Sequence, residues 1–360
     1  VNISNPYWLR KEREAGSFVV DDQILIGLPE SKAPFTCNFT VEIYGETIDF
    51  SVPLYKRITD PVDGELYSQV KIAPPAVINI EKDLYFFNGS SSKDIKVTVQ
   101  SFKDNLSGKI LFNINNGWKT EPATIDFSDM KKNQKKDYFI KVTPSQSSDK
   151  SEIIAKVLID GNEYSKKIIR KQYKHIMPQT IFQESKAVFQ SYDLTKSKLK
   201  KIGYIPGSGD LIPDFLSDLG FGVVVFDDKQ FSQNQLEQYD AIITGIRAYN
   251  TRDELSAFQK ELFKYVENGG TLISQYNTTA QLILNPGIYP LKISHDRVTD
   301  ENSPVKILNK DHKIFNFPYK ITEDDFKGWI QERGLYFPNE WDSKYETLLS
   351  MNDNGEKEKL

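Results

Sequence analysis

The sequence has little of what metal sites and disulfides need. Its 360 residues include one cysteine, Cys37, and only three histidines, which are His175, His295 and His312. A single cysteine excludes an internal disulfide, and it also excludes a cysteine-rich zinc site. None of the histidines belongs to a His-Glu-x-x-His pair. We therefore expect no catalytic metal and no cofactor in this chain.

Strong positive charge and long apolar runs are also missing. The net charge is −4, which argues against a general nucleic-acid binder, because such proteins are basic. No apolar run reaches the ~18 residues of a membrane span, so the sequence predicts none. The chain begins at Val1 without a methionine and ends in a charged stretch. We interpret it as a fragment of a longer protein.

The first half of the chain has the rhythm of all-β structure. Short alternating runs are separated by turn signals such as Tyr44-Gly45-Glu46 and Asn116-Gly117, a spacing that favours β-sandwich modules. Pro74-Pro75 marks a joint, since two prolines favour an extended connection. The sequence thus predicts an incomplete sandwich-like module over residues 1–74 and an Ig-like β-sandwich over 75–178.

From residue 179 onward, strands alternate with helices. The predicted strands are Lys201–Ile205, Val223–Phe226, Ala241–Thr244 and Thr271–Ser274, with helices over Leu211–Leu219 and after Thr251. Thr251 and Glu254 have the spacing of a capping box at the start of the second helix. This order predicts a doubly wound, flavodoxin-like α/β domain over residues 179–360.

Polar residues follow two neighbouring parallel strands of that domain. Arg247, Tyr249 and Asn250 come after the first, and Gln275 and Asn277 come after the second. Ligands of open α/β sheets bind at the carboxyl ends of the strands. We therefore expect these side chains to meet at one edge of the sheet, in a structural network or at a ligand site.

Two further segments are candidates for the same site. Arg297 follows His295-Asp296, and the stretch Trp329–Trp341 combines aromatic rings with Glu332 and Arg333. Aromatic faces with planar hydrogen-bonding groups suit a sugar ring, with Trp329 stacking on its C–H surface. A packed loop with a buried Arg333–Glu332 pair explains the same residues.

Gly207-Ser208-Gly209 is half of a dinucleotide fingerprint. The third glycine is missing, because Ile212 stands in its place, and no Walker lysine follows. A plain strand-to-helix turn explains the glycines best, with a bound dinucleotide or another ligand pocket as alternatives.

A family resemblance rests on stretches spread over nearly the whole chain. They are Asn5–Leu9, Gln23–Pro29, Tyr204–Asp210, Gly245–Arg252, Asn268–Leu272, Gln275–Asn277, His295–Thr299 and Gly328–Phe337. Here the chain resembles the C-terminal, non-deacetylase region of long PIG-L (LmbE-like) deacetylases of Bacteroidetes type. The runs 245–252 and 328–337 are the more specific ones.

The resemblance implies a parent protein with an N-terminal zinc-dependent domain that deacetylates N-acetylglucosamine-type substrates. The metal motif of that domain, of the His-Pro-Asp-Asp-Glu kind, has no counterpart here, since the chain contains no His-Pro pair. Zinc is therefore expected only in the missing catalytic domain, and this chain should hold no catalytic residue.

The resemblance also implies a class I glutamine-amidotransferase-like α/β domain. Its usual cysteine and histidine have no match here, and the domain usually continues past a stretch like Leu348–Asn352, so we expect truncation at the C-terminus. A periplasmic or extracellular location follows from the family alone.

Our leading hypothesis is a non-catalytic accessory region of a glycan-processing deacetylase, whose partner is a glycan or the deacetylase domain itself. One alternative is a hydrolase in its own right, using Asp296 or Glu332 as a base at the sheet edge. Another is a purely structural module.

Overall fold

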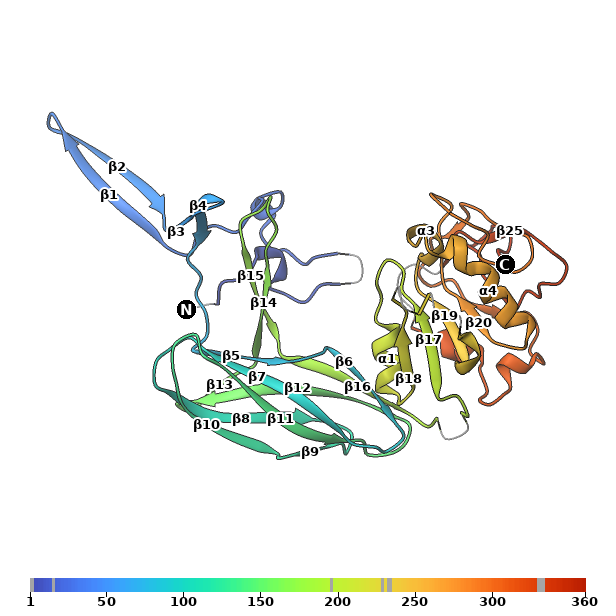
Figure 1. Ribbon diagram of the computed structural model, residues 1–360. Coiled ribbons are helices and arrows are strands. Elements are labelled where there is room, and N and C mark those ends of the chain that lie inside the picture. Colours follow the sequence, from blue (N-terminus) through green and yellow to red (C-terminus); the bar gives the residue numbers. More distant parts are fainter. Residues whose placement is uncertain (1–2, 15–16, 195–196, 228–229, 232–234, 329–333) are drawn as a thin grey trace. The chain divides into compact units, whose positions relative to one another are not determined.

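The computed structural model describes residues 3–14, 17–194, 197–227, 230–231, 235–328 and 334–360 (Figure 1). The chain divides into two compact units, one that ends at Ser191 and one that starts at Tyr192. Among the described residues, no helix has the length and apolar character needed to cross a membrane.

A β-sandwich makes up most of the first unit. One sheet has the strand order β10-β8-β12-β16-β6, with β13 beside β12, and the other has the order β5-β7-β11-β9. The strands of the first sheet are β6 (Leu84–Asn88), β8 (Leu106–Ile114), β10 (Thr124–Met130), β12 (Asp149–Ile159), β13 (Asn162–Tyr164) and β16 (Lys186–Tyr192). Those of the second are β5 (Ala76–Ile80), β7 (Lys93–Ser101), β9 (Lys119–Glu121) and β11 (Lys135–Thr143).

Alternation along these strands builds the core between the two sheets. In β12, burial alternates residue by residue from Ser151 to Ile159, as a strand with one covered face requires. The Trp118 ring stacks on Phe189 and meets Phe87 edge-on at centroid distances of 5.6 and 5.0 Å. The strand-rich, sandwich-containing architecture predicted for this part of the chain is confirmed.

The sandwich extends beyond the predicted boundary at residue 178. β16 pairs with β12 over Ala187 and Phe189, both of which are buried. Pro178 therefore precedes the last strands of the unit instead of ending it. β14 (Lys166–Lys171) and β15 (Gln179–Glu184) pair with each other on either side of this proline.

The described part of the first 74 residues contains two separate hairpins and two short 3-10 helices. The hairpins are β1 (Thr36–Ile43) with β2 (Glu46–Pro53), and β3 (Tyr55–Asp60) with β4 (Gly64–Gln69). The 3-10 helices cover Tyr7–Leu9 and Gln23–Leu25. Every residue of β1 and β2 is exposed.

The second unit is built on a parallel sheet with the order β18-β17-β19-β20. Its strands are β17 (Lys201–Ile205), β18 (Gly222–Val225), β19 (Ala241–Thr244) and β20 (Leu272–Ser274). β17 and β19 agree with their predicted bounds to the residue. Helix α1 (Ile212–Asp218) packs on one side of the sheet and α4 (Leu255–Glu267) on the other (Figure 1).

The predicted capping box at Thr251 is wrong. A one-turn helix, α3 (Ala248–Thr251), precedes α4, and Thr251 donates its hydroxyl back to the Arg247 carbonyl at 3.0 Å. Helix α4 begins at Leu255 with no side-chain cap from Glu254. The hydroxyl closes the preceding turn, so it is unavailable to α4.

Short antiparallel pairs complete the second unit. They are β21 (Leu291–Ile293) with β25 (Pro338–Trp341), β22 (Arg297–Val298) with β24 (Gly334–Leu335), and β23 (Lys306–Ile307) with β26 (Leu349–Ser350). Three further 3-10 helices cover Leu236–Gln238, Lys313–Phe315 and Glu323–Phe326.

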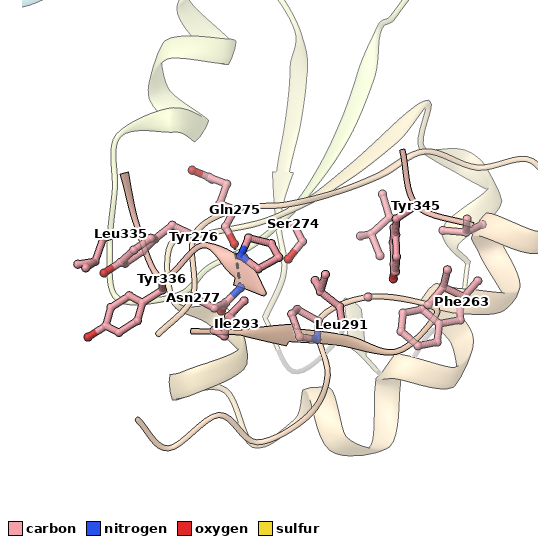
Figure 2. Close-up of a pocket in the computed structure, with 16 residues that line it drawn as sticks. Phe263, Ser274, Gln275, Tyr276, Asn277, Leu291, Ile293, Leu335, Tyr336 and Tyr345 are labelled. Atoms are coloured by element: carbon pink, nitrogen blue, oxygen red, sulfur yellow. Dashed lines mark hydrogen bonds between the residues drawn. The ribbon is translucent and has the colours of Figure 1, made fainter. Parts of the chain in front are cut away.

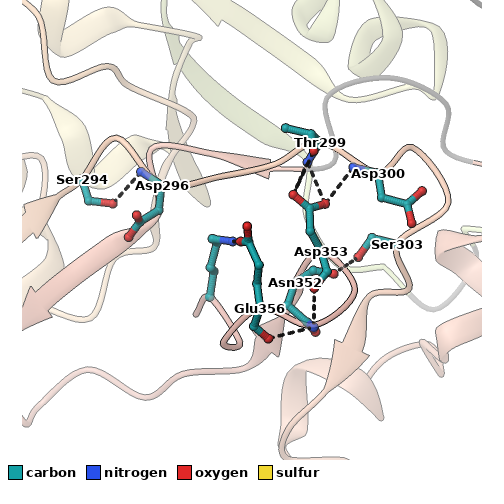
Figure 3. A network of polar contacts seen from close by, with 9 residues as sticks. Ser294, Asp296, Thr299, Asp300, Ser303, Asn352, Asp353 and Glu356 are labelled. Atoms are coloured by element: carbon teal, nitrogen blue, oxygen red, sulfur yellow. Dashed lines mark hydrogen bonds and ion pairs between the residues drawn. The ribbon is translucent and has the colours of Figure 1, made fainter.

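One carboxylate ties the end of the chain to the loop after β22. Asp353 accepts hydrogen bonds from the backbone N–H groups of Thr299 and Asp300 at 2.7 to 3.0 Å (Figure 3). These bonds, led by the one from Asp300, lower the pKa of Asp353. Ser303 adds a bond from its hydroxyl to the Asn352 carbonyl at 2.7 Å.

Candidate functional site

The carboxyl ends of β17 and β19 are closed by contacts between their own loops. The Ser208 N–H donates to the Ile246 carbonyl at 2.8 Å. A Cβ atom built on Gly207 would lie 2.0 Å from that same carbonyl oxygen. Only glycine lets the two loops approach so closely, which confirms the interpretation of this motif as a tight turn.

A buried phenol reinforces this closure. Tyr204 donates its hydroxyl to Asp210, and the Gln275 amide donates to the same hydroxyl at 3.3 Å. Burial raises the pKa of Tyr204, and the Asp210 carboxylate raises it further. Asp210 also accepts from the Ile246 N–H at 3.3 Å. Gln275 therefore contacts the residues around the turn after β17. Its amide nitrogen is used in a structural hydrogen bond to Tyr204.

Asn250 and Asn277 are brought together as expected, and both are used structurally. The Asn250 amide donates to the carbonyls of Thr278 and Ala280 at 2.9 Å each and accepts from the Thr278 N–H at 2.9 Å. Asn277 accepts from the Tyr249 N–H at 3.1 Å and donates to the Gln275 carbonyl at 2.8 Å. Together they clamp the segment 275–280 to α3.

The Tyr249 side chain is buried, whereas Arg247 is exposed to solvent. Tyr249 is fully buried, and this burial raises its pKa. Within the described residues its hydroxyl has no hydrogen-bond partner. Arg247 is exposed with a left-handed φ of 59°, and its N–H donates to the Tyr276 carbonyl at 2.7 Å. Neither side chain lines the pocket described below.

The remaining predicted residues are placed only in part. Arg297 lies on β22 opposite Leu335 and is exposed. Trp329, Glu332 and Arg333 lie outside the described residues, so the structure does not place their side chains.

A cavity of about 450 Å³ opens beside β20, next to the predicted edge. Residues after β20 line it together with α4, the segment 286–293 and the segment 335–345 (Figure 2). The lining residues are Phe263, Val266, Leu272, Ser274, Gln275, Tyr276, Asn277, Pro286, Gly287, Ile288, Leu291, Ile293, Leu335, Tyr336, Pro338 and Tyr345. We refer to this cavity as the β20 pocket.

Two tyrosines stand together at one end of the β20 pocket (Figure 2). The rings of Tyr276 and Tyr336 lie 5.9 Å apart at an angle of 48°. Tyr336 has a φ of 59°, a left-handed conformation that costs ~1–3 kcal/mol for a bulky residue. The Tyr336 N–H donates to the Asp296 carbonyl at 2.8 Å, which holds the residue in that conformation.

Tyr345 forms part of the opposite wall with its hydroxyl already engaged. It donates to the Tyr289 carbonyl at 2.9 Å and accepts from the Tyr289 N–H at 3.0 Å. A Cβ atom on Gly287 would lie 2.0 Å from this hydroxyl oxygen. This wall is therefore rigid, and it offers a ligand only the ring face of Tyr345.

None of the described residues that line the β20 pocket carries an ionic side chain. The polar lining groups are the Ser274 hydroxyl, the Gln275 and Asn277 amides and the tyrosine hydroxyls. A charged ligand would lack a counter-charge here, which is costly in a partly desolvated site. The lining therefore favours a neutral ligand with apolar faces.

The candidate metal-ligating residues are dispersed over the described part of the chain. No group of three or more His, Cys, Asp or Glu residues there could hold a metal ion. Asp296, the base of the hydrolase alternative, is exposed and is not part of the β20 pocket. Glu332 lies outside the described residues.

Comparisons with known proteins leave the family open. No family model matches the chain, and no curated protein matches it either. Among solved structures, the chain is similar to the native alpha-2-macroglobulin of Escherichia coli at 12% identity and a TM-score of 0.22, over 40% of this chain and 9% of that one. WR4, a C. elegans MSP family member, matches at 11% identity and a TM-score of 0.18, over 32% and 96%.

A family 123 glycoside hydrolase from Clostridium perfringens matches at 10% identity and a TM-score of 0.21, over 56% of this chain and 48% of that one. The chain thus spans less than half of the macroglobulin and of the hydrolase. TM-scores this low do not establish a shared fold or function.

Proposed function

We propose that this chain is a non-catalytic accessory region that binds a neutral sugar residue of a glycan in the β20 pocket. The observation that carries the proposal is the lining itself, in which aromatic rings and amides stand without ionic groups. A sugar ring has an apolar C–H face and neutral hydroxyls, so it matches such a lining. A volume of about 450 Å³ accommodates one or two sugar residues.

In this proposal Tyr276 and Tyr336 cover the C–H face of the sugar. Tyr276 is 39% exposed, so its ring is accessible. The Ser274 hydroxyl and the side-chain oxygen Oε1 of Gln275 take sugar hydroxyls, because the Asn277 amide and the Gln275 backbone carbonyl already serve the clamp described above.

The resemblance to PIG-L deacetylases suggests the wider setting. We place the chain after a zinc-dependent deacetylase domain acting on N-acetylglucosamine-type glycans, outside the cytoplasm. The second unit would then be a flavodoxin-like, glutamine-amidotransferase-like domain. The order β18-β17-β19-β20 with helices on both faces supports this assignment.

Calorimetric titration with neutral N-acetylglucosamine oligosaccharides tests the proposal. Tyr276→Ala should weaken binding by about 1–2 kcal/mol, or roughly 5- to 30-fold, because a ring face is lost. Tyr276→Phe keeps that face and should bind within about two-fold of the wild type. Since the ligand is neutral, affinity should not change with salt.

The control is Tyr44→Ala, which removes a fully exposed ring from a hairpin tip in the other unit. It should leave binding unchanged. No binding by the wild type at millimolar sugar, or equal binding by Tyr276→Ala and the wild type, would refute the proposal.

A further inference from the structure

The β1–β2 hairpin has one apolar face that nothing in the described part of the first unit covers. Cross-strand pairs on this face are Phe35–Leu54, Cys37–Val52, Phe39–Phe50 and Val41–Ile48. The large side chains among these pairs are 38% to 50% exposed, and Cys37 is exposed as well. We refer to these residues together with Ile43 as the apolar hairpin face.

The opposite face of the same hairpin is polar and internally satisfied. Thr40 donates to Asp49 at 2.5 Å, and Ser51 donates to Asn38 at 2.6 Å. The hairpin is therefore amphipathic. The polar side chains of one face are hydrogen-bonded to each other, whereas the apolar side chains of the other face have no packing partner in the described part of the first unit. A two-stranded hairpin alone is marginally stable, and packing on an apolar layer is what stabilises it.

The exposed area is sufficient for two copies of this face to pack on each other. The face carries three aromatic and five aliphatic large side chains, each about half exposed. With ~150–250 Å² for each aromatic side chain and somewhat less for each aliphatic one, the face presents roughly 600 Å² per copy. Two copies would bury roughly 1,200 Å², the lower end of the range for specific interfaces.

We propose that the apolar hairpin face is a homodimer interface, in which two copies of this chain pack hairpin on hairpin about a two-fold axis. The two apolar faces then form the two layers of a small sandwich. The charged residues Glu42 and Asp49, on the polar face, stay in water. Isologous pairing of this kind is the commonest form of oligomer.

Sedimentation of the full chain over about 1–100 µM tests the pairing, and a dimer mass should appear within this range. Ile48→Lys buries a charge in the interface and should weaken association on the order of 100-fold. Thr47→Lys is the matched control, since it adds the same charge one residue away on the polar face and should leave the dimer intact.

Cys37 lies on the apolar hairpin face, so the reactivity of its thiol measures whether that face is covered. Cys37 should react quickly with Ellman's reagent in dilute protein and more than about ten-fold more slowly when the chain is dimeric. A single-copy mass at every concentration would refute the interface. Equally slow labelling at every concentration would show that another segment covers the face, and would refute it too. A dimer that persists in Ile48→Lys would show that the two copies associate through another surface, and this too would refute the proposal.

Discussion

Asn250 should be a structural residue, and replacing it measures how strongly the clamp holds the loop after β20. Asn250→Ala removes two hydrogen bonds donated by the amide and one accepted from the Thr278 N–H. Asn250 is 8% exposed and Thr278 is 7% exposed, so water cannot replace these bonds without opening the loop.

The expected cost follows from these three bonds. Each is worth about 1 kcal/mol net, and leaving the buried Thr278 N–H unpaired costs about 1–3 kcal/mol by itself. Alanine recovers about 0.5 kcal/mol through its higher helix propensity in α3. We therefore expect a local destabilisation of about 2–3 kcal/mol.

Amide hydrogen exchange is the appropriate assay, because unfolding of a chain with two units is not a single two-state transition. Exchange in the segment 277–280 should become about 30- to 150-fold faster in Asn250→Ala, which corresponds to 2–3 kcal/mol of opening free energy. The sandwich strands, such as β12, should exchange as in the wild type.

Arg247→Ala is the matched control, three residues earlier in the same loop. Arg247 is exposed, so its replacement should change stability by no more than about 0.5 kcal/mol. Exchange in 277–280 that rises less than about five-fold in Asn250→Ala would show that the clamp does not hold the loop. A large effect of Arg247→Ala would show that its side chain has a structural partner.

Two further substitutions follow from contacts already described. Gly207→Ala should destabilise the second unit by more than about 2 kcal/mol, since the new Cβ meets the Ile246 carbonyl. Gly209→Ala meets nothing within 4 Å and should cost only about 1 kcal/mol for its positive φ, so equal thermal shifts would contradict the close approach. Asp353→Asn should destabilise the chain at neutral pH. The pKa of Asp353 is depressed in the folded state, so its contribution is present above its ordinary value of 3.8 and is lost as pH falls through the folded pKa. The thermal midpoints of wild type and Asp353→Asn should therefore converge below about pH 4, and a constant difference would contradict this role.

The parallel strands could be predicted from sequence because burial on both faces leaves a simple signal. Ala241–Thr244 is buried at all four positions and reads as a short apolar run between polar segments. The end of the sandwich could not be predicted in the same way. The predicted boundary lay at residue 178, and the strand Lys186–Tyr192, which pairs with β12 in the same sheet, comes after it.

Two of the residues predicted for the candidate site, Gln275 and Asn277, line the β20 pocket, whereas the others that the structure describes do not. Spacing along the chain shows that Asn250 and Asn277 share a sheet edge, yet it cannot show that backbone groups a few residues away satisfy both amides. The aromatic stretch Trp329–Trp341 was a better signal, because it contributes Tyr336 to the β20 pocket. Phe263 faces the same pocket from α4, and no signal in the sequence singled it out.

The close packing of the turns explains why the pocket lies beside the sheet's usual ligand position. A phosphate at the end of β17 would need free backbone N–H groups in the glycine turn. The Ser208 N–H is instead donated to the Ile246 carbonyl, and Gly207 lies against the same oxygen. These contacts argue against a dinucleotide there. The open space begins two strands away from β17, at β20, where the described lining is aromatic and uncharged. A ligand of this unit should therefore be recognised by ring faces and neutral hydrogen bonds, with little contribution from charge.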